Sequence, residues 1–374
     1  MEPDAVETLL QDSWFRAQGL GPGTILTLHP DDEMSRVDLL KVTPERRRMF
    51  YMRTGYEAAR VLENVLAAAG RPLAELPSLL DFACGYGRPM RFLRRVLPPE
   101  RIFASDVVKP AVAFVGQTFG VHAFESATEP EDIRFPGRFS AICVFSLFSH
   151  LPLRTFETFL TTLYERLEPD GLLVFTTLTP ADLPEAERDP SGFTYRMESG
   201  IPHLDVEDYG TTYAGPEVVR GICNRLGIRH HWTLERELWR IQDVHVVARR
   251  DFPGLARWTQ APIGRGAILS ATLDAAGHAR AEGYVRTPRL ESPVRDVEIR
   301  IDGTRAVPCA FRAHPLTLPE KDGGARFQQT DWFVEGPAPE LLTGVHAIAG
   351  VVTLKNGARS CFDVEPLVRT DARA

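Results

Sequence analysis

One short stretch of the sequence places a carboxylate directly before a glycine turn. An apolar pair, Leu79–Leu80, leads into Asp81, and the turn that follows holds Gly85 and Gly87. Residues 90–93 suit the start of a helix. Glycines let the backbone approach a ligand, and the first N–H groups of a helix point toward an anion. The stretch therefore predicts a site for a ligand that carries a carboxylate or a phosphate.

A second carboxylate, Asp106, ends the predicted strand 101–106 and lies 21 residues after Gly85. In a doubly wound sheet it would lie beside the glycine turn, where it could accept hydrogen bonds from both hydroxyls of a ribose. A dinucleotide fingerprint would need a small residue at position 88, which is Arg88. The pattern therefore indicates an adenosine-containing cofactor and counts against a dinucleotide. The small residues of the turn are Ala83, Gly85 and Gly87.

Strand-like and helix-like segments alternate between residues 43 and 250. The expected helices are 43–69, 155–167 and 216–226, and the expected strands are 79–81, 101–106, 121–124, 139–145, 172–176, 232–241 and 244–248. The last two strands suggest an antiparallel pair. This order predicts an α/β fold with a doubly wound, mainly parallel seven-stranded sheet covered by helices on both faces.

The remaining residues divide into three further parts. Residues 1–42 are expected to form an N-terminal extension or cap, and the long polar connection 178–214 is expected to be a functional lid or wall. In 252–374, short alternating segments are separated by turn signals such as Asp302-Gly303. These signals predict an accessory β-sandwich of roughly seven strands.

Composition excludes several classes of protein. The 374 residues are 44% hydrophobic and 25% charged, which is typical of a soluble globular protein, and the net charge of −7 argues against a general affinity for nucleic acid or anionic membranes. No apolar run is long enough to span a membrane, and the acidic first residues do not resemble a signal peptide. Five scattered cysteines without a Cys-x-x-Cys pair indicate reduced thiols in a cytoplasmic protein and no metal site.

The stretch Asp81-Phe-Ala-Cys-Gly-Tyr-Gly resembles motif I of the class I S-adenosylmethionine-dependent methyltransferases, an acidic residue followed by Gly-x-Gly-x-Gly. The resemblance covers roughly 43–250 and includes Ser105-Asp106, 145–152 and 167–174. Two more segments, 209–213 and 242–246, are similar to a bacterial branch often found near glycan and secondary-metabolite genes. The sequence departs from the motif at Ala83, where the first glycine is expected. Because alanine is small, we expect the site to survive, provided that this position does not need a positive φ.

The resemblance implies a set of residues for the S-adenosylmethionine site. Asp81, with the backbone around Ala83 and Gly85, should hold the methionine amino group, Arg53 its carboxylate, and Asp106 the ribose. Cys84 is expected to be a small buried residue and no nucleophile. The other residues implied for the cofactor site lie before the turn, within it, or after the second and fourth strands: Tyr51, Gly55, Cys84, Gly87, Val107, Phe145 and Ser146.

The implied reaction is the transfer of a methyl group to a hydroxyl, or an amine, of a small molecule such as a sugar or glycosylated metabolite, in biosynthesis. The enzyme must align the reacting atoms and exclude water, and an alcohol acceptor also needs a base. His150 is the expected base because it follows the fourth strand, although a histidine there could simply cap a turn. The residues expected to line the acceptor site are His203, Asp205, Tyr209 and Tyr213.

Two other functions stay open at this stage. One is a catalytically silent cofactor-binding protein whose sandwich binds a glycan or a partner, and the other is an NAD-dependent oxidoreductase. Arg88 and the antiparallel last pair of strands count against the oxidoreductase. A homodimer is a further expectation, which the sandwich could serve. His230-His231 suggests metal ligands, but a strand face is the preferred interpretation.

Overall fold

The computed structural model describes residues 3–20, 23–35, 44–198, 205–239, 241–256, 265–287, 294–317, 326–355 and 359–370. The chain divides into two compact units. The first contains residues 24–35 and 51–260, and the second contains residues 1–23, 36–50 and 261–374. The expected extension 1–42 is therefore shared between the two units and does not form a part of its own.

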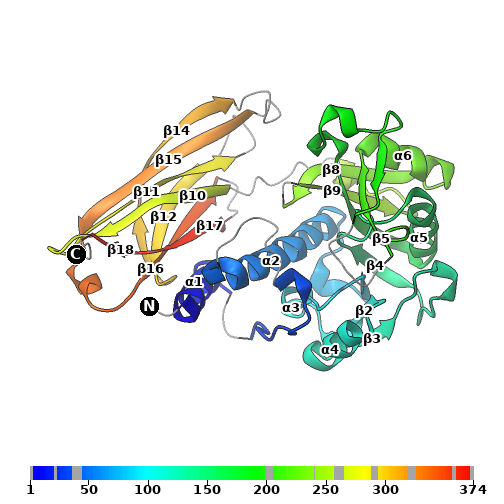
Figure 1. Ribbon diagram of the computed structural model, residues 1–374, viewed down its shortest axis with the longest axis horizontal. Helices are drawn as coiled ribbons and strands as arrows, with labels where there is room; N and C mark the ends of the chain where they lie inside the picture. Colours follow the sequence, from blue (N-terminus) through cyan, green and yellow to red (C-terminus); the bar gives the residue numbers. More distant parts are fainter. Residues whose placement is uncertain are drawn as a thin grey trace. The chain divides into compact units, whose positions relative to one another are not determined.

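The first unit is built on a sheet that follows the predicted doubly wound order (Figure 1). Its first five strands are parallel neighbours in the order β3, β2, β1, β4, β5, and β9 then pairs antiparallel with β5 and with β8. The strands are β1 (Leu79–Phe82), β2 (Ile102–Asp106), β3 (His122–Glu125), β4 (Phe139–Val144), β5 (Leu167–Leu178), β8 (His230–Leu238) and β9 (Gln242–Ala248). The α/β class and the seven-stranded core are confirmed.

The connection 178–214 adds two further strands to this sheet. These are β6 (Phe193–Arg196) and β7 (Thr211–Ala214), which pair antiparallel with each other. β7 joins the carboxyl end of β5 through the pair Leu178 and Tyr213. The expected lid or wall is thus partly a hairpin on the sheet, which brings the total to nine strands.

Helices cover this sheet because their apolar side chains recur once per turn. α5 buries Phe156, Phe159, Leu160 and Leu163, which share one core with sheet residues such as Ile142. Figure 1 shows α5 and α6 together on one side of the sheet. Leu167, expected on the α5 face, instead begins β5, because the helix ends at Glu165. The α-helices of the described residues are α1 (Pro3–Ala17), α2 (Pro44–Ala68), α3 (Met90–Leu93), α4 (Lys109–Phe119), α5 (Leu153–Glu165), α6 (Pro216–Arg225) and α7 (Pro253–Ala256).

The second unit contains a β-sandwich, as predicted, but the described strands of this sandwich number nine instead of about seven. One sheet has the order β14 (Ala310–Thr317), β15 (Arg326–Pro337), β11 (His278–Thr287), β10 (Arg265–Leu273) and β18 (Val368–Arg369). The other has the order β13 (Arg305–Pro308), β12 (Val294–Ile301), β16 (Ala347–Leu354) and β17 (Arg359–Pro366). Alternating side chains from both sheets form the core, where the ring centroids of Trp332 and Phe362 lie 5.9 Å apart.

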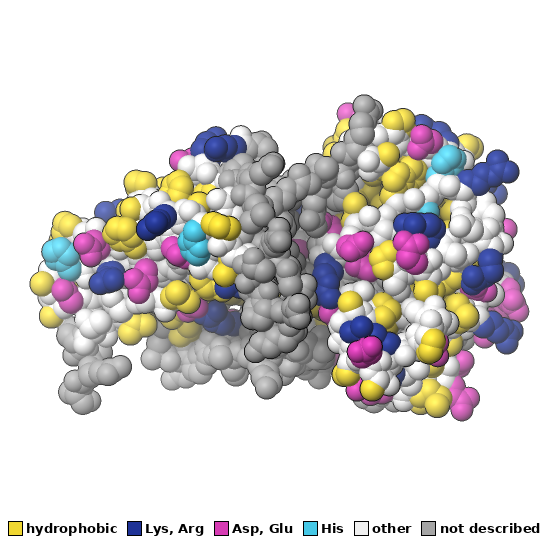
Figure 2. Space-filling view, turned by 90° about the horizontal axis from the view of Figure 1, so that it is seen from above, with side chains coloured by type: hydrophobic (Ala, Val, Ile, Leu, Met, Phe, Trp, Pro, Cys, Tyr) yellow, Lys and Arg dark blue, Asp and Glu magenta, His cyan; other side chains and the backbone are white. Residues whose placement is uncertain are grey.

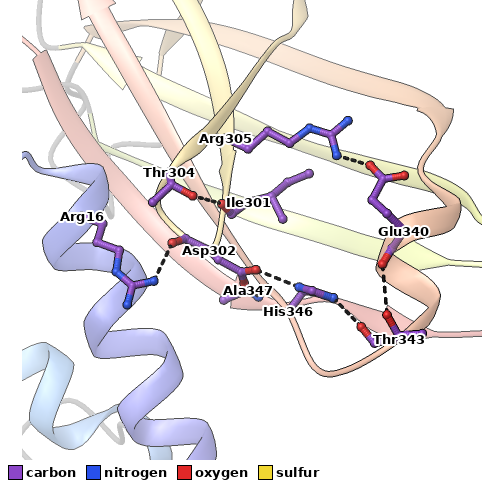
Figure 3. A network of polar contacts seen from close by, with 9 residues as sticks. All are labelled: Arg16, Ile301, Asp302, Thr304, Arg305, Glu340, Thr343, His346 and Ala347. Atoms are coloured by element: carbon purple, nitrogen blue, oxygen red, sulfur yellow. Dashed lines mark hydrogen bonds and ion pairs between the residues drawn. The ribbon is translucent and has the colours of Figure 1, made fainter.

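Helix α1 packs onto the four-stranded sheet of this unit. Arg359 Nη1 donates to the carbonyl of Ala17 at 2.7 Å, and Arg16 Nη1 donates to the carbonyl of Asp302 at 3.4 Å (Figure 3). In the same network, His346 Nδ1 lies 2.8 Å from Asp302 Oδ2, and its Nε2 lies 2.9 Å from the carbonyl of Thr343. Although partial burial lowers it, these two acceptors raise the pKa of His346 above its ordinary value, so the network favours the protonated ring.

The described surface mixes charges of both signs. Figure 2 shows acidic and basic side chains interspersed over the described parts of the face in view. Among the described helices, none is both long and apolar enough to cross a membrane.

Candidate active site

The glycine turn after β1 adopts the left-handed backbone that such a turn requires. Ala83, Gly85 and Gly87 have φ values of 57°, 51° and 74°. A Cβ on Gly87 would lie 2.6 Å from a ring carbon of Phe119, so only glycine fits there. The N–H of Gly85 donates to Asp106 Oδ2 at 2.7 Å, which ties the turn to the end of β2. The glycine turn and Asp106, which were predicted from separate parts of the sequence, are therefore joined by a hydrogen bond.

Ala83 does not meet the condition under which we expected it to be harmless. Its φ of 57° lies in the left-handed region, which costs a residue with a Cβ about 1 kcal/mol relative to glycine. The turn keeps its shape and carries this cost.

Cys84 is buried within the turn, as expected. Its N–H donates to the carbonyl of Ser105 at 3.1 Å. Burial, together with the nearby carboxylates of Asp106 and Asp81, raises the pKa of its thiol well above the ordinary value. The backbone of Cys84 thus joins the turn after β1 to β2. Its thiol is neutral and is not a nucleophile.

Asp81 is a buried carboxylate with one oxygen left for a ligand. Its side chain is 2% exposed, and Oδ1 accepts a hydrogen bond from the Cys143 thiol at 3.6 Å. Oδ2 is buried and accepts no hydrogen bond from any described residue. Burial raises the pKa of Asp81 to about 7; the thiol lowers it and Asp106 raises it further. A buried oxygen without a donor fits a cationic amino group, such as that of the methionine part of the cofactor.

Asp106 is positioned by backbone donors at the end of β2. Its Oδ1 accepts from the N–H of Val108 at 2.9 Å, while Oδ2 is bound by Gly85. Burial raises the pKa of Asp106, and these backbone hydrogen bonds partly lower it again. Each oxygen keeps lone-pair capacity for a ribose hydroxyl. Val107, which the resemblance would place against an adenine, is exposed beside it.

A segment that sequence reasoning did not assign to the site, 24–35, packs on the glycine turn. Arg91 of α3 is almost fully buried, and its Nη1 donates to the carbonyls of Ile25 at 2.6 Å and Thr27 at 3.3 Å. An arginine between apolar residues of a short buried helix was the signal that could have indicated such a contact. This guanidinium fixes the path of segment 24–35.

Two further contacts hold segment 24–35 against the site. The ring of His29 stacks on that of Tyr86 in the glycine turn, with centroids 4.6 Å apart. The hydroxyl of Tyr51 donates to Asp32 Oδ2 at 2.5 Å, and burial, followed by the charge of Asp32, raises the pKa of Tyr51. The Tyr51 phenol is therefore engaged by the covering segment, and its predicted contact with the methionine part stays a prediction.

The two other α2 residues predicted for the cofactor have structural partners. Arg53 Nε lies 3.2 Å from Glu57 Oε1, one turn further along the helix. A Cβ on Gly55 would lie 2.3 Å from the carbonyl oxygen of Arg88, so glycine is required for α2 to approach the turn. The guanidinium of Arg88 lies over the Trp239 ring, 4.6 Å from its centroid. The bulk of Arg88, which counted against a dinucleotide, thus fills space between α2 and residue 239.

The ends of β4 and β5 meet the start of β9 beside the turn. Ser146, which follows Phe145 after β4, has a φ of 69°, and its N–H donates to Thr176 Oγ1 at 2.9 Å. Gln242 Nε2 donates to Ser146 Oγ at 3.1 Å. Phe145 is half-buried at this edge. Ligands bind at the carboxyl ends of strands in sheets of this type, and this is where both residues were predicted to lie.

His150 is held in one tautomer. Its Nδ1 lies 2.7 Å from the carbonyl oxygen of Gly210, so Nδ1 carries the proton and Nε2 is left as an acceptor. The ring stacks on Tyr209, with centroids 4.5 Å apart and planes 13° apart. Burial lowers the pKa of His150, and the Gly210 carbonyl raises it in part. The ring is therefore neutral near pH 7.

The phenol of Tyr209 is buried, and two carboxylates act on it through their charge. Burial raises its pKa, and the charges of Asp106 and Glu33 raise it further, so the phenol stays protonated. The N–H of Gly210 also donates to the carbonyl of His150 at 2.9 Å. Two of the predicted residues, His150 and Tyr209, are thus brought together, and sequence reasoning did not foresee the effect of the Glu33 charge on Tyr209.

The other predicted acceptor residues are not part of this pair. Asp205 is exposed, and its Oδ1 accepts from the N–H of Glu207 at 3.0 Å within a turn. Tyr213 is half-buried in β7 below the guanidinium of Arg196, 5.8 Å from the ring centroid. His203 lies outside the described residues.

One of the two histidines considered as metal ligands, His231, belongs to a polar chain within the sheet. His231 Nε2 lies 3.1 Å from His245 Nδ1, and His245 Nε2 lies 3.0 Å from Thr177 Oγ1. Burial lowers the pKa of His231 to about 4 and that of His245 well below its ordinary value, so both rings are neutral. The strand-face interpretation fits this network.

Residues 51–233 match the family model described as "Methyltransferase domain". This part of the chain is similar to methyltransferase domains. The match covers a little under half of the chain and includes the glycine turn, Asp106 and the His150–Tyr209 pair. This likeness agrees with S-adenosylmethionine, the cofactor that the sequence predicts. No curated protein matches the sequence significantly.

Several solved structures resemble the methyltransferase domain at low identity. A DhpI complex with SAH is 18% identical, covers 67% of this chain and 100% of its own, and has a TM-score of 0.39. DesVI of Streptomyces venezuelae is 16% identical, covers 53% of this chain and 92% of its own, and also has a TM-score of 0.39. These scores are low, and the fold is defined by the strand order and register given above.

Proposed function

We propose that the protein transfers a methyl group from S-adenosylmethionine to a hydroxyl, or an amine, of a small molecule, such as a sugar or glycosylated metabolite. The observation that carries this proposal is the state of His150. With Nδ1–H donated to Gly210 and the ring stacked on Tyr209, Nε2 is an acceptor at the carboxyl edge of β4. That is the arrangement a general base needs.

Each residue of the site has a defined task in this proposal. Asp81 Oδ2 accepts from the amino group of the cofactor, and Asp106 accepts from its ribose hydroxyls. When bound, S-adenosylmethionine supplies a methyl group that is already activated by a sulfonium. Segment 24–35 and Tyr209 exclude water, which favours in-line transfer to the aligned acceptor.

His150 moves the one proton of the reaction. As the bond between the acceptor oxygen and the methyl carbon forms and the bond between sulfur and that carbon breaks, Nε2 takes the hydroxyl proton. The Gly210 carbonyl and the neutral phenol of Tyr209 keep the ring oriented before and after this step. An amine acceptor would lose its proton to the same nitrogen.

Turnover can be tested without knowing the natural acceptor. The protein is incubated with S-adenosylmethionine and a panel of sugars, aminosugars and glycosylated aromatic compounds, and released S-adenosylhomocysteine is measured. We expect acceptor-dependent release that His150→Gln lowers at least about 100-fold while cofactor affinity is kept. Equal release by wild type and His150→Gln would contradict the role of His150.

A second function, cofactor binding without turnover, is favoured by one observation. Ala83 places a Cβ at a left-handed position of the cofactor turn, where the motif has glycine. This function predicts cofactor binding with no release of S-adenosylhomocysteine when the panel or fractionated extracts are added.

We further propose that the protein is a cytoplasmic homodimer that binds neither nucleic acid nor membranes. Light scattering tests the dimer, and binding assays test the absence of the other partners.

A further inference from the structure

The sandwich contains a cavity that the methyltransferase function does not use. Its volume is about 460 Å³, which lies within the range of small-molecule pockets, roughly 300–1,000 Å³. It is lined by β12, by the link between β13 and β14, and by side chains of β16 and β17. We call it the sandwich cavity, and its charged and aromatic lining residues are Arg295, Asp296, Glu298, Arg300, Phe311 and Arg359.

The charges of the sandwich cavity are unbalanced toward positive. Arg300 Nε donates to Glu298 Oε1 at 2.8 Å, and Arg359 Nη2 donates to the same oxygen at 3.0 Å. Arg295 is matched by its neighbour Asp296 at 2.6 Å. Two half-buried guanidinium groups therefore share one carboxylate. An anionic ligand would restore the balance in a protein whose overall charge is negative.

Arg300 has the donors that such a ligand would use. Arg359 also donates through Nη1 to the carbonyl of Ala17, so its role is partly to hold α1. The two Nη groups of Arg300, in contrast, make no hydrogen bond to any other described residue, and its side chain is 27% exposed. The planar pair of N–H groups on a guanidinium matches the two oxygens of a carboxylate.

Phe311 adds an apolar face to the same cavity. It lies opposite Trp332 in the β14–β15 register, so its ring points to the core side of the sheet. Because β14 is the last strand of that sheet, the ring is not covered and is 42% exposed. The N–H of Cys309 donates to the carbonyl of Val297 at 2.9 Å, which fixes the link that carries Phe311.

We propose that the sandwich cavity binds a sugar carboxylate, that is, a uronic acid residue. Arg300 binds the carboxylate through its Nη groups, Phe311 packs against the C–H face of the sugar ring, and Glu298 accepts from a ring hydroxyl. The ligand is held by an exposed aromatic face and a paired donor, which together recognise an acidic sugar. This inference does not depend on methyl transfer.

The test is a titration of the full chain with glucuronate, followed by NMR or calorimetry. We expect saturable binding that is at least about tenfold tighter than binding of glucose or acetate, since each of these lacks one of the two recognised features. Arg300→Gln and Phe311→Ala should each weaken glucuronate binding about tenfold or more. The matched control is Arg280→Gln, an exposed arginine paired with Glu282 on β11, which should bind as wild type does.

Affinity for S-adenosylhomocysteine is measured in the same samples. It should not change in the Arg300→Gln or Phe311→Ala variants, so a folding defect or a failure of the methyltransferase proposal is detected separately. Equal affinity for glucuronate, glucose and acetate would overturn the proposed site. So would unchanged glucuronate binding by Arg300→Gln.

Discussion

The Nδ1 atom of His150 lies 2.7 Å from the carbonyl oxygen of Gly210, and this contact joins the loop after β4 to the hairpin of residues 178–214. It sets the tautomer of the ring, while Tyr209 sets its plane. Gly210, which is distant from His150 in the sequence, thereby determines the tautomer of the His150 ring.

The first prediction concerns the pH dependence of turnover. Because burial lowers the pKa of His150 below its ordinary value of 6.5, the neutral base is present at pH 7 and is lost only in more acidic solution. At saturating S-adenosylmethionine, we expect kcat/KM for the acceptor to stay level from pH 8 to pH 7 and then to fall tenfold per pH unit below the lowered His150 pKa. A stopped assay of S-adenosylhomocysteine release measures this profile. A profile that His150→Gln leaves unchanged would assign the acidic limb to another group.

The second prediction separates stability from binding at Asp81. Burial raises the pKa of Asp81 to about 7 from an ordinary value of 3.8, so its contribution to stability is present below pH 3.8 and is lost as pH rises through about 7. Asp81→Asn removes this loss. We therefore expect the Tm of the cofactor-free variant, relative to wild type, to be higher at pH 8 than at pH 5. Cofactor affinity should fall at least about tenfold, because the carboxylate partner of the amino group is gone. A relative Tm that does not change with pH would contradict the buried, unpaired state of Asp81 Oδ2.

The third prediction is that a substitution at Ala83 stabilises the protein, whereas most core substitutions destabilise it. Its φ of 57° is strained for alanine, so Ala83→Gly should raise the free energy of unfolding by about 0.5–1 kcal/mol. Urea unfolding of the two proteins measures the difference. A loss of stability would show that the backbone at position 83 is not left-handed in solution.

Gly55 should be intolerant of a methyl group. Since a Cβ there would lie 2.3 Å from a backbone oxygen of Arg88, Gly55→Ala should lower the free energy of unfolding by about 1–3 kcal/mol. The control is Gly221→Ala in α6, where the nearest atom lies 3.8 Å away in a flexible side chain. That variant should be stabilised by about 0.5–1 kcal/mol through helix propensity. Equal effects of the two substitutions would contradict the close approach of α2 to the turn.

Local sequence patterns were sufficient to predict the central strands of the first unit and the position of its glycine turn. Buried apolar runs indicated β1, β2, β4 and β5, and the distance from Gly85 to Asp106 indicated that the turn meets the end of β2. The hydrogen bond between these two residues is the physical basis of that spacing. The start of β5 at Leu167 was missed because a leucine at that spacing also continues the apolar stripe of α5.

Contacts between distant segments could not be predicted in the same way. The stacking of His29 on Tyr86 and the donation from Tyr51 to Asp32 join residues that no local period relates. The left-handed backbone of Ala83 follows from the shape of the turn and not from the preference of alanine. Similarly, the docking of α1 on the sandwich depends on Arg359, which lies at the other end of the chain.

The central claim, a methyltransferase domain whose cofactor is held by the glycine turn and Asp106, is tested most directly by calorimetric titration with S-adenosylhomocysteine. We predict one saturable site per chain in the wild type and at least about 100-fold weaker binding in Asp106→Ala, which loses the acceptor for both ribose hydroxyls and the anchor of Gly85. Absence of binding heat in the wild type across several temperatures, or binding that Asp106→Ala leaves unchanged, would contradict the claim.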